Sequence, residues 1–320
     1  MHTVIIGGAS TIGVTIAYTL ATVEPTMDLT LLDKDRKSAW AHGLDIAHST
    51  FHSTQSPVDQ ETADSFGAIQ AVGSDGLDDL DPDLIVFTAA APQPADATSA
   101  DARDAELEAN RSIVDSVAPA LRSNRPVPVL VLSNPIDRIT YRLWKQVGWS
   151  RKYFLGYSVS ETARVAHRIS EIQDVHPGTV YCPVMGEHGS EIVPIFSRLR
   201  IDGVATTLTD EQRSDVRRYA REIPFEIAKE RGVSETSRWV TSAGVVRIIR
   251  KMMANDPSPT CLSTPLAGEY GFSDGCLSVP VVLTLDGVTD IIEWDLSADE
   301  KQRLKSAHET ICTDIEVQNL

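Results

Sequence analysis

The sequence predicts an α/β protein, with a doubly wound parallel sheet in its first half and an α+β domain after it. In the first half, short apolar runs alternate with segments of helical periodicity, which is typical of parallel strands covered by helices on both faces. Beyond Trp149 the alternation stops, and long helices mix with short strands. We therefore divide the chain into two domains, residues 1–148 and residues 149–320.

The opening stretch combines a strand, a glycine-rich turn and a helix. The apolar run Thr3–Ile6 ends in a turn with G-x-G-x-x-G spacing, and a second apolar run ends in Asp33, twenty residues beyond the last glycine. A helix N-terminus attracts a pyrophosphate, and an acid at this distance accepts hydrogen bonds from a ribose. The pattern predicts a Rossmann-type domain that binds a dinucleotide through Gly7, Gly8, Ser10, Thr11, Ile12, Gly13 and Asp33.

Two details of this turn matter for the cofactor. Ser10 stands where the middle glycine is usual, so its side chain crowds the approach of the phosphates. Asp33 repels a 2′-phosphate and favours NAD over NADP, although Lys34 and Arg36 lie nearby. The alternative is an ordinary glycine turn with a solvent-facing Asp33, but the flanking strands and helix favour the cofactor site.

The rest of the first half continues the alternation. Ligands of such sheets bind at the carboxyl ends of the strands, where Thr88 and Asn134 also lie. The small-residue span Ala95–Ala105 is interpreted as a mobile lid. The expected elements are a helix over Ser38–His48, strands over Ala68–Val72, Asp83–Thr88 and Pro128–Leu132, and a helix carrying Arg103 and Asn110.

In the second half, a polar turn at Met185–Ser190 separates two apolar runs. Glycines on both sides of His188 let the chain bend and leave the imidazole projecting from a rigid edge. Alone, such a histidine most often only decorates a turn. The expected strands are Thr179–Val184, Ile192–Phe196, Ile201–Val204, Leu277–Leu283 and Gly287–Ile292, and the expected helices are Thr209–Arg231, Thr236–Met253 and Ser297–Ile315.

Composition narrows the class of protein. The chain of 320 residues can bury a large core, and its mean hydropathy of -0.12 is that of a soluble globular protein. No window approaches the roughly 20 apolar residues of a membrane-spanning helix. The first apolar run follows Met1 without the charged region and cleavage site of a signal peptide. We expect a cytoplasmic protein without a membrane partner.

The balance of charge is strongly acidic. With 45 acidic and 29 basic residues the formal net charge is -16, so the chain repels polyanions and nucleic acid is a poor candidate partner. Only 8 of the basic residues are lysines, and an acidic, lysine-poor surface suits a salt-rich cytoplasm, where ions screen the self-repulsion. Ordinary acidity without a need for salt is the alternative.

The four cysteines are scattered and show no C-x-x-C spacing. Free buried thiols are therefore expected rather than a disulfide framework, and no metal site is predicted. The cysteines are Cys182, Cys261, Cys276 and Cys312.

Three further motifs occur in order along the chain. They are Ser133-Asn134-Pro135, Ser160-Glu161-Thr162-Ala163-Arg164 and Gly186-Glu187-His188-Gly189. With these motifs the chain resembles the lactate/malate dehydrogenase family, from Val4 to the C-terminal helix. The resemblance implies an NAD-dependent enzyme that transfers a hydride between nicotinamide and a small L-2-hydroxy acid.

The resemblance assigns proton transfer to His188, which matches the acid/base histidine of the family. The carboxylate partner of that histidine is usually an aspartate, and here it is Glu161. Arg164 lies three residues on, on the same helical face, and matches the clamp for the substrate carboxylate. The alternative is a surface acid paired with an exposed arginine, but the surrounding motif favours the site.

Other site residues are also implied by the resemblance. Arg103 matches the lid arginine that polarises the substrate carbonyl, although Ala105 and Glu106 depart from the family pattern and the loop before them looks longer. Asn134 is expected to hydrogen-bond the substrate oxygen, and Ser237 to line the substrate pocket. The cofactor groove is completed by Thr88, Ala89, Ala90 and Asn110.

Substrate choice in the family depends on the lid. Malate enzymes carry an arginine where this chain has Gln93, and a neutral glutamine cannot offset the desolvation of a second carboxylate. We therefore expect a monocarboxylate such as lactate, with malate as the alternative. A protein of another class, an NAD(H)-binding redox sensor without turnover, also stays open, whereas a metal-assisted hydrolase lacks a Cys/His ligand pair. Members of the family are typically homodimers or homotetramers, and we expect a homo-oligomer.

Overall fold

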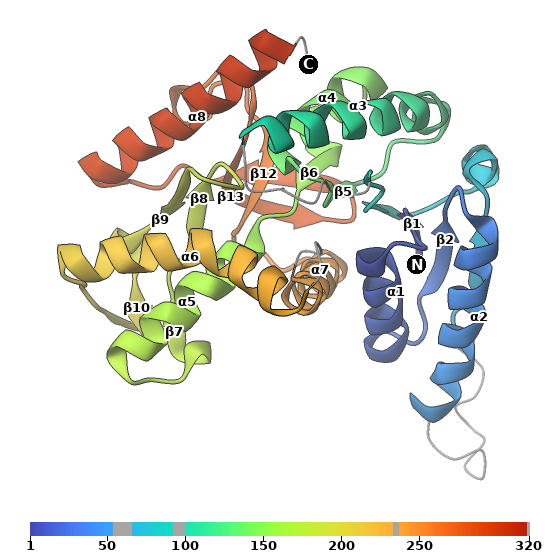
Figure 1. The fold of residues 1–320 in the computed structure, drawn as a ribbon, viewed down its shortest axis with the longest axis horizontal. Coiled ribbons are helices and arrows are strands. Elements are labelled where there is room, and N and C mark those ends of the chain that lie inside the picture. The colour runs from blue at the N-terminus through green and yellow to red at the C-terminus, as the bar shows by residue number, and fades with distance from the viewer. Residues whose placement is uncertain (54–65, 92–99, 233–236, 319–320) are drawn as a thin grey trace.

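The computed structural model describes residues 1–53, 66–91, 100–232 and 237–318 (Figure 1). Within these ranges, eleven strands form one mixed sheet. In spatial order they are β3 (Ile69–Val72), β2 (Asp28–Leu32), β1 (His2–Ile6), β4 (Leu84–Phe87), β5 (Val129–Val131), β6 (Phe154–Gly156), β12 (Thr260–Pro265), β13 (Cys276–Thr284), β8 (Val184–Gly186) and β9 (Ile192–Pro194), with β14 (Gly287–Ile291) beside β13.

The first six strands of this order are parallel, as the sequence predicts for a doubly wound fold. From β12 onward the neighbours are antiparallel, and β6 joins the two parts because Gly156 also pairs with Ser263 of β12. One sheet thus runs through both halves of the chain. The domain boundary at residue 148 stays a prediction.

The helices cover both faces of this sheet (Figure 1). Within the described ranges they are α1 (Thr11–Val23), α2 (Arg36–Ser53), α3 (Ala100–Ser123), α4 (Ile136–Val147), α5 (Val159–Gln173), α6 (Asp210–Glu230), α7 (Arg238–Met253) and α8 (Ala298–Gln318). None of these helices has the length and apolar character needed to cross a bilayer.

The buried faces of the parallel strands explain how the helices divide between the two sides. Ile5 and Val86 pack in one core cluster with residues of α1, α2 and α7, whereas Val4 and Phe87 pack in another with residues of α3 and α4. Neighbouring residues of one strand therefore face opposite layers, as the pleat requires. This burial on both faces accounts for the continuous apolar runs in the sequence.

The second half differs from the prediction at two strands and adds two others. The expected strand Ile201–Val204 is instead a hairpin, because Asp202 and Gly203 both have positive φ and turn the chain so that Ile201 pairs antiparallel with Val204. The expected strand Thr179–Val184 is split, because Val180–Tyr181 (β7) pairs in a separate small sheet with Arg200–Ile201 (β10), while the chain after Pro183 joins the large sheet as β8. The small sheet is completed by β11 (Val204–Ala205). Strands β6 and β12 were not predicted.

Helices α2 and α8 extend beyond their predicted limits, and α8 ends at Gln318 rather than Ile315. Helix α2 covers residues 36–53 rather than 38–48, and α3 already begins at Ala100, inside the span interpreted as a lid. The part of that span from residue 95 to residue 99 lies outside the described residues.

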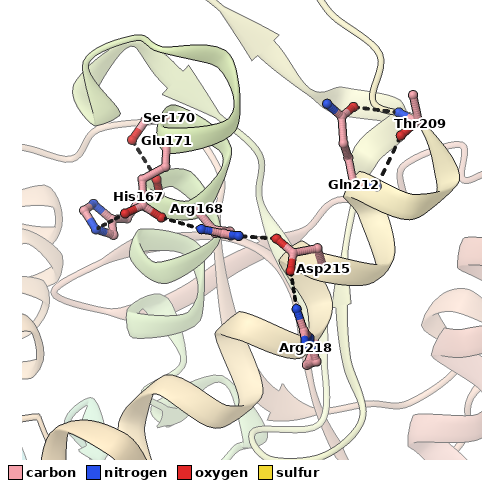
Figure 2. A network of polar contacts seen from close by, with 8 residues as sticks. All are labelled: His167, Arg168, Ser170, Glu171, Thr209, Gln212, Asp215 and Arg218. Carbon is pink, nitrogen blue, oxygen red and sulfur yellow. Dashed lines mark hydrogen bonds and ion pairs between the residues drawn. The ribbon is translucent and has the colours of Figure 1, made fainter.

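Helices α5 and α6 are tied together by a polar network (Figure 2). The Arg168 guanidinium on α5 lies 2.9 Å from Glu171 on its own helix and 2.7 Å from Asp215 on α6. The N-terminus of α6 is fixed by a capping box, in which Thr209 accepts from the N–H of Gln212 and donates its own N–H to the Gln212 side chain. The Arg168–Asp215 pair thus links α6 to α5, the helix that carries Glu161 and Arg164.

Candidate active site

The turn between β1 and α1 requires its glycines. Gly7 has φ +84, and a Cβ atom there would lie 2.5 Å from the backbone nitrogen of Ala89. A Cβ atom on Gly13 would lie 2.4 Å from the Gly7 carbonyl oxygen. The turn therefore packs directly on the end of β4, with backbone against backbone.

Ser10 occupies the N-cap of α1. Its hydroxyl accepts a hydrogen bond from the N–H of Gly13 at 3.0 Å, and it lies 3.4 Å from the hydroxyl of Thr88. The first helical turn, which opens with Thr11 and Ile12, carries no acidic residue. This N-terminus is suited to an anionic group such as a pyrophosphate.

Asp33 lies just beyond β2, beside the same turn. One carboxylate oxygen accepts from the N–H of Ala9 at 3.0 Å and the other from the N–H of Asp35 at 2.9 Å. A glycine turn without room for side chains, a helix N-terminus without acids and a backbone-held carboxylate fit the phosphates and ribose of NAD.

The ends of β4 and β5 are joined by side chains. Thr88 donates to the carbonyl oxygens of Ile6 and Gly7 at 2.9 and 3.0 Å, so its hydroxyl braces the glycine turn. Asn110 is buried, and it accepts from the N–H of Ala91 at 2.7 Å and donates to the carbonyl oxygen of Asn134 at 2.6 Å. The amide of Asn110 thus connects the two strand ends that carry other predicted site residues.

His188 projects from a turn closed by its neighbours. Gly186, before it, has φ +94, and a Cβ atom there would lie 2.5 Å from the Glu191 carbonyl oxygen. The Glu187 carboxylate accepts from the N–H of Glu191 at 3.0 Å, across the turn. The local sequence therefore holds the imidazole at a rigid bend, as predicted.

The structure brings His188, Glu161 and Arg164 together. The imidazole Nδ1 and the Arg164 guanidinium each lie 3.1 Å from the same Glu161 oxygen, Oε1. Among the described residues, neither Nδ1 of His188 nor Oε2 of Glu161 has a hydrogen-bond partner of ordinary geometry. The histidine and the carboxylate are thus at hydrogen-bonding distance but not aligned.

Burial and charge act in opposite directions on this pair. Burial is the largest single effect on the pKa of His188 and lowers it, but the Glu161 carboxylate and then Asp137 together raise it, and the net pKa lies above that of an ordinary histidine. Burial raises the pKa of Glu161, whereas His188 and then Arg164 lower it, and the net pKa lies below its ordinary value. The arrangement stabilises an imidazolium beside a carboxylate, as an acid/base group at neutral pH requires.

Two residues at the start of α4 contact the turn that carries His188, and neither was predicted from the sequence as a site residue. Asp137 accepts a hydrogen bond from the backbone N–H of His188 at 2.7 Å. Arg138 forms a buried ion pair with Glu187 at 2.9 Å and also contacts Asp314 of α8. An acid and a base in adjacent positions of an otherwise apolar helix start are the only indication that the sequence offers.

For the remaining predicted site residues the structure shows fewer contacts. Ser237 is buried at the N-cap of α7, and its hydroxyl has no hydrogen-bond partner among the described residues. Helix α7 is linked to α5 through Tyr157, whose hydroxyl lies 2.9 Å from Ser160 and donates to the Val240 carbonyl oxygen at 3.2 Å. Gln93 and the side chain of Arg103 lie outside the described residues.

No cluster of three or more potential metal ligands occurs in the part of the chain that the structure describes. Cys182, Cys261 and Cys276 are buried free thiols, as predicted, whereas Cys312 is only partly buried and its Sγ lies 3.4 Å from Nε2 of His308. A cavity of about 620 Å³ opens between α5 and α6, but acids and arginines line it together and none of the predicted site residues contributes. The candidate site is therefore the edge of the sheet around the β1–α1 turn, Asn134 and His188.

Comparison with known proteins identifies the family. Residues 1–156 match the NAD-binding domain of lactate/malate dehydrogenases, and residues 161–319 match their α/β C-terminal domain. A malate dehydrogenase of Pyrobaculum islandicum is 31% identical over 248 residues, which are 76% of this chain and 78% of that protein. An L-lactate dehydrogenase of Halalkalibacterium halodurans is 27% identical over 311 residues, or 96% and 94% of the two chains.

Solved structures show the same architecture. The malate dehydrogenase of Cryptosporidium parvum superposes with a TM-score of 0.87 at 25% identity, covering 100% of this chain and 99% of the other. The lactate dehydrogenase of that organism, solved with lactic acid and nicotinamide adenine dinucleotide, has a TM-score of 0.87 at 24% identity, and 99% of this chain and 98% of the other are covered. The chain belongs to the lactate/malate dehydrogenase family and is an NAD-dependent 2-hydroxyacid dehydrogenase.

Proposed function

We propose that the protein interconverts a small L-2-hydroxy monocarboxylate, such as lactate, and its 2-keto acid. The observation that carries the chemistry is the contact of His188 with Glu161, the residue that also holds Arg164. A proton donor, its charge partner and a carboxylate clamp are the groups that this reaction needs around the substrate.

His188 is the acid/base of the proposed mechanism. The bound cofactor would supply the hydride chemistry, as acceptor in its oxidised form and as donor in its reduced form. During reduction of a keto acid, protonated His188 gives its proton to the C2 oxygen while C2 receives the hydride; during oxidation it takes the hydroxyl proton back. Glu161 stabilises the imidazolium through Nδ1, which leaves Nε2 to face the substrate.

Arg164 is the proposed clamp for the substrate carboxylate. Its guanidinium offers two parallel N–H groups, which match a carboxylate in a bidentate pair, and its contact with Glu161 orients it. Asn134, at the end of β5, is the proposed donor to the C2 oxygen, and Ser237 lines the pocket. Arg103, on α3, completes the set as the group that polarises the carbonyl.

The preference for a monocarboxylate rests on Gln93 and is the finer part of the proposal. A malate-type substrate has a second carboxylate, and burying it without a cation costs several kcal/mol, on the order of 3–5 when a buried charge is left unpaired. Malate dehydrogenase is the second candidate, because relatives with that name cover the chain as fully as lactate dehydrogenases do.

The test of substrate class is a comparison of kcat/KM for pyruvate, oxaloacetate and 2-ketoisocaproate with NADH. We expect pyruvate or 2-ketoisocaproate to be preferred, and Gln93→Arg to shift the preference towards oxaloacetate. A clear preference of the unaltered protein for oxaloacetate contradicts the monocarboxylate proposal and leaves the hydride-transfer chemistry intact.

We also propose a cytoplasmic homo-oligomer. The apolar face of α5 is covered within the chain by α6 and the small sheet. Exposed apolar side chains lie on α2 instead, where Trp40, Leu44 and Phe51 follow one another at helical spacing. Such a stripe supports association with a second copy.

A further inference from the structure

Asp137 is a buried carboxylate that the proposed chemistry does not use. It lies in the first turn of α4 and is fully buried, with 0% of its surface exposed. Its Oδ2 accepts the backbone N–H of His188 at 2.7 Å. Its Oδ1 has no hydrogen-bond partner of ordinary geometry among the described residues. Burying a carboxylate that accepts one N–H and leaves its other oxygen unpaired costs more free energy than holding the turn alone requires.

The groups around Asp137 are mixed in charge. Glu187, on the same turn as His188, repels it, and the neighbouring Arg138 is already paired with Glu187 and Asp314. The hydroxyl of Ser263 on β12 and the N–H and charge of His188 favour the ionised form. The buried thiol of Cys276 on β13 lies within its field.

We propose that Asp137 is a second, buried carboxylate that positions His188 from behind and stabilises its protonated form. The inference rests on the proposed role of His188 as the acid/base. Glu161 acts at the ring through Nδ1, and Asp137 acts at the backbone N–H of the same residue, so two carboxylates, from α5 and α4, contact His188 at two different points.

The electrostatics of the pair support this arrangement. Burial, and then the Glu187 carboxylate, raise the pKa of Asp137 to about 6. Asp137 in turn contributes to the raised pKa of His188. The protonation states of Asp137 and His188 thus influence one another. Above about pH 6 the ionised Asp137 favours the imidazolium, and below it this contribution is lost as Asp137 takes up a proton.

The first test is Asp137→Asn, which keeps an oxygen able to accept the His188 N–H but removes the charge. We measure kcat/KM for pyruvate with NADH across a pH series. Because reduction needs protonated His188, the rate falls as pH rises through its pKa; in the variant this limb is expected to lie roughly one pH unit lower. Asp137→Ala also removes the acceptor, so we expect a further loss in kcat with little change in KM.

The matched control is Asp115→Asn. Asp115 lies on α3, is about half exposed and pairs with Arg142, one turn further along α4. The Asp115→Asn substitution therefore removes a carboxylate that contacts α4 but does not contact the turn that carries His188. The pH profile of this variant is expected to match that of the unaltered protein.

A second readout does not depend on turnover. In protein labelled at its histidines, nuclear magnetic resonance follows the ring titration of His188, identified by its loss in His188→Asn. The midpoint is expected to fall in Asp137→Asn, and by less in Ser263→Ala, which removes a hydroxyl that favours the ionised Asp137 and conserves the packing. Ser263→Ala serves if Asp137→Asn does not fold.

The outcomes are distinct. A His188 midpoint and a pH limb that stay unchanged in both variants overturn the role of Asp137. Absence of turnover with pyruvate, oxaloacetate and 2-ketoisocaproate in the unaltered protein overturns the proposed function, while the ring titration still decides whether Asp137 acts on His188.

Discussion

His188 and Glu161 meet at 3.1 Å, but their groups are not aligned for an ordinary hydrogen bond. Glutamate is one methylene longer than the aspartate usual in the family, and a single oxygen of its carboxylate contacts both the histidine and Arg164. Sequence spacing could place Glu161 and Arg164 together, because residues three apart share a helical face, whereas His188 was joined to them by the resemblance to the family. It could not show how the longer acid would meet the ring.

Glu161→Gln tests the charge of this acid. The amide cannot stabilise an imidazolium, so we expect kcat for keto acid reduction to fall by about 10²–10⁴-fold, the range that a positioned acid/base contributes. Glu161→Asp is the matched variant, since it keeps the charge and restores the side chain usual in the family. Steady-state rates with NADH and pyruvate measure both. Equal activity of Glu161→Gln and the unaltered protein contradicts the assigned role.

The raised pKa of His188 fixes the direction of the pH dependence. Reduction requires the protonated ring, so its kcat/KM is expected to be level at lower pH and to fall as pH rises through the raised pKa. Oxidation requires the neutral ring and is expected to rise over the same range. Glu161, with its lowered pKa, stays ionised throughout. A reduction rate that increases with pH contradicts this assignment.

At the scale of elements, α5 and α7 are joined by the buried Tyr157. Its hydroxyl reaches Ser160, beside Glu161, and the Val240 carbonyl oxygen of α7. The fit depends on Gly244 of α7, because a Cβ atom there would lie 2.1 Å from the Tyr157 hydroxyl oxygen. A glycine in a helix thus fixes the start of the helix that carries the acid and the clamp.

Gly244→Ala tests this packing. We expect the clash with Tyr157 to exceed the helix-propensity gain of alanine and to destabilise the protein by about 1–3 kcal/mol, with a parallel loss of kcat. Gly43→Ala in α2 is the control, because its Cβ meets nothing closer than a 3.8 Å contact with Ile69, and it is expected to stabilise by up to about 1 kcal/mol. Urea unfolding measures both. Stabilisation by Gly244→Ala contradicts the account.

Some elements could be predicted from sequence and others could not. The parallel strands could, because burial on both faces leaves continuous apolar runs. Strand β6 has three residues, and β12 ends in Pro265 and lies among prolines, which reads as a loop. Strands β7 and β8 are separate because they pair with different strands, and the hydrophobic periodicity of a sequence does not show which strands pair. Asp137 meets His188 across 51 positions of sequence, a contact that only the fold creates.

At the scale of the whole molecule, the net charge of -16 is the dominant property. Many acids are paired on the surface, as in the contacts of Arg125 with Asp83 and of Arg303 with Asp299, and exposed pairs of this kind each add little. The unpaired excess repels itself across the surface in dilute salt. The fold therefore carries an electrostatic cost that mobile ions reduce.

Salt is expected to stabilise the protein for this reason. The melting temperature should rise from low to molar potassium chloride, because the Debye length falls from tens of ångströms to about 3 Å and screens the excess charge. Sucrose at matched viscosity controls for effects unrelated to charge. A melting temperature that does not change with salt contradicts a salt-adapted surface and leaves ordinary acidity as the explanation.

The most direct test of the central claim, that His188 is the acid/base of a 2-hydroxyacid dehydrogenase, is His188→Asn assayed by NADH oxidation with a panel of 2-keto acids. We predict that turnover is lost while NADH binding, followed by fluorescence, is retained, because the cofactor turn at Gly7–Gly13 is remote in sequence and built from its own contacts. Substantial turnover by His188→Asn, with a pH profile like that of the unaltered protein, contradicts the claim.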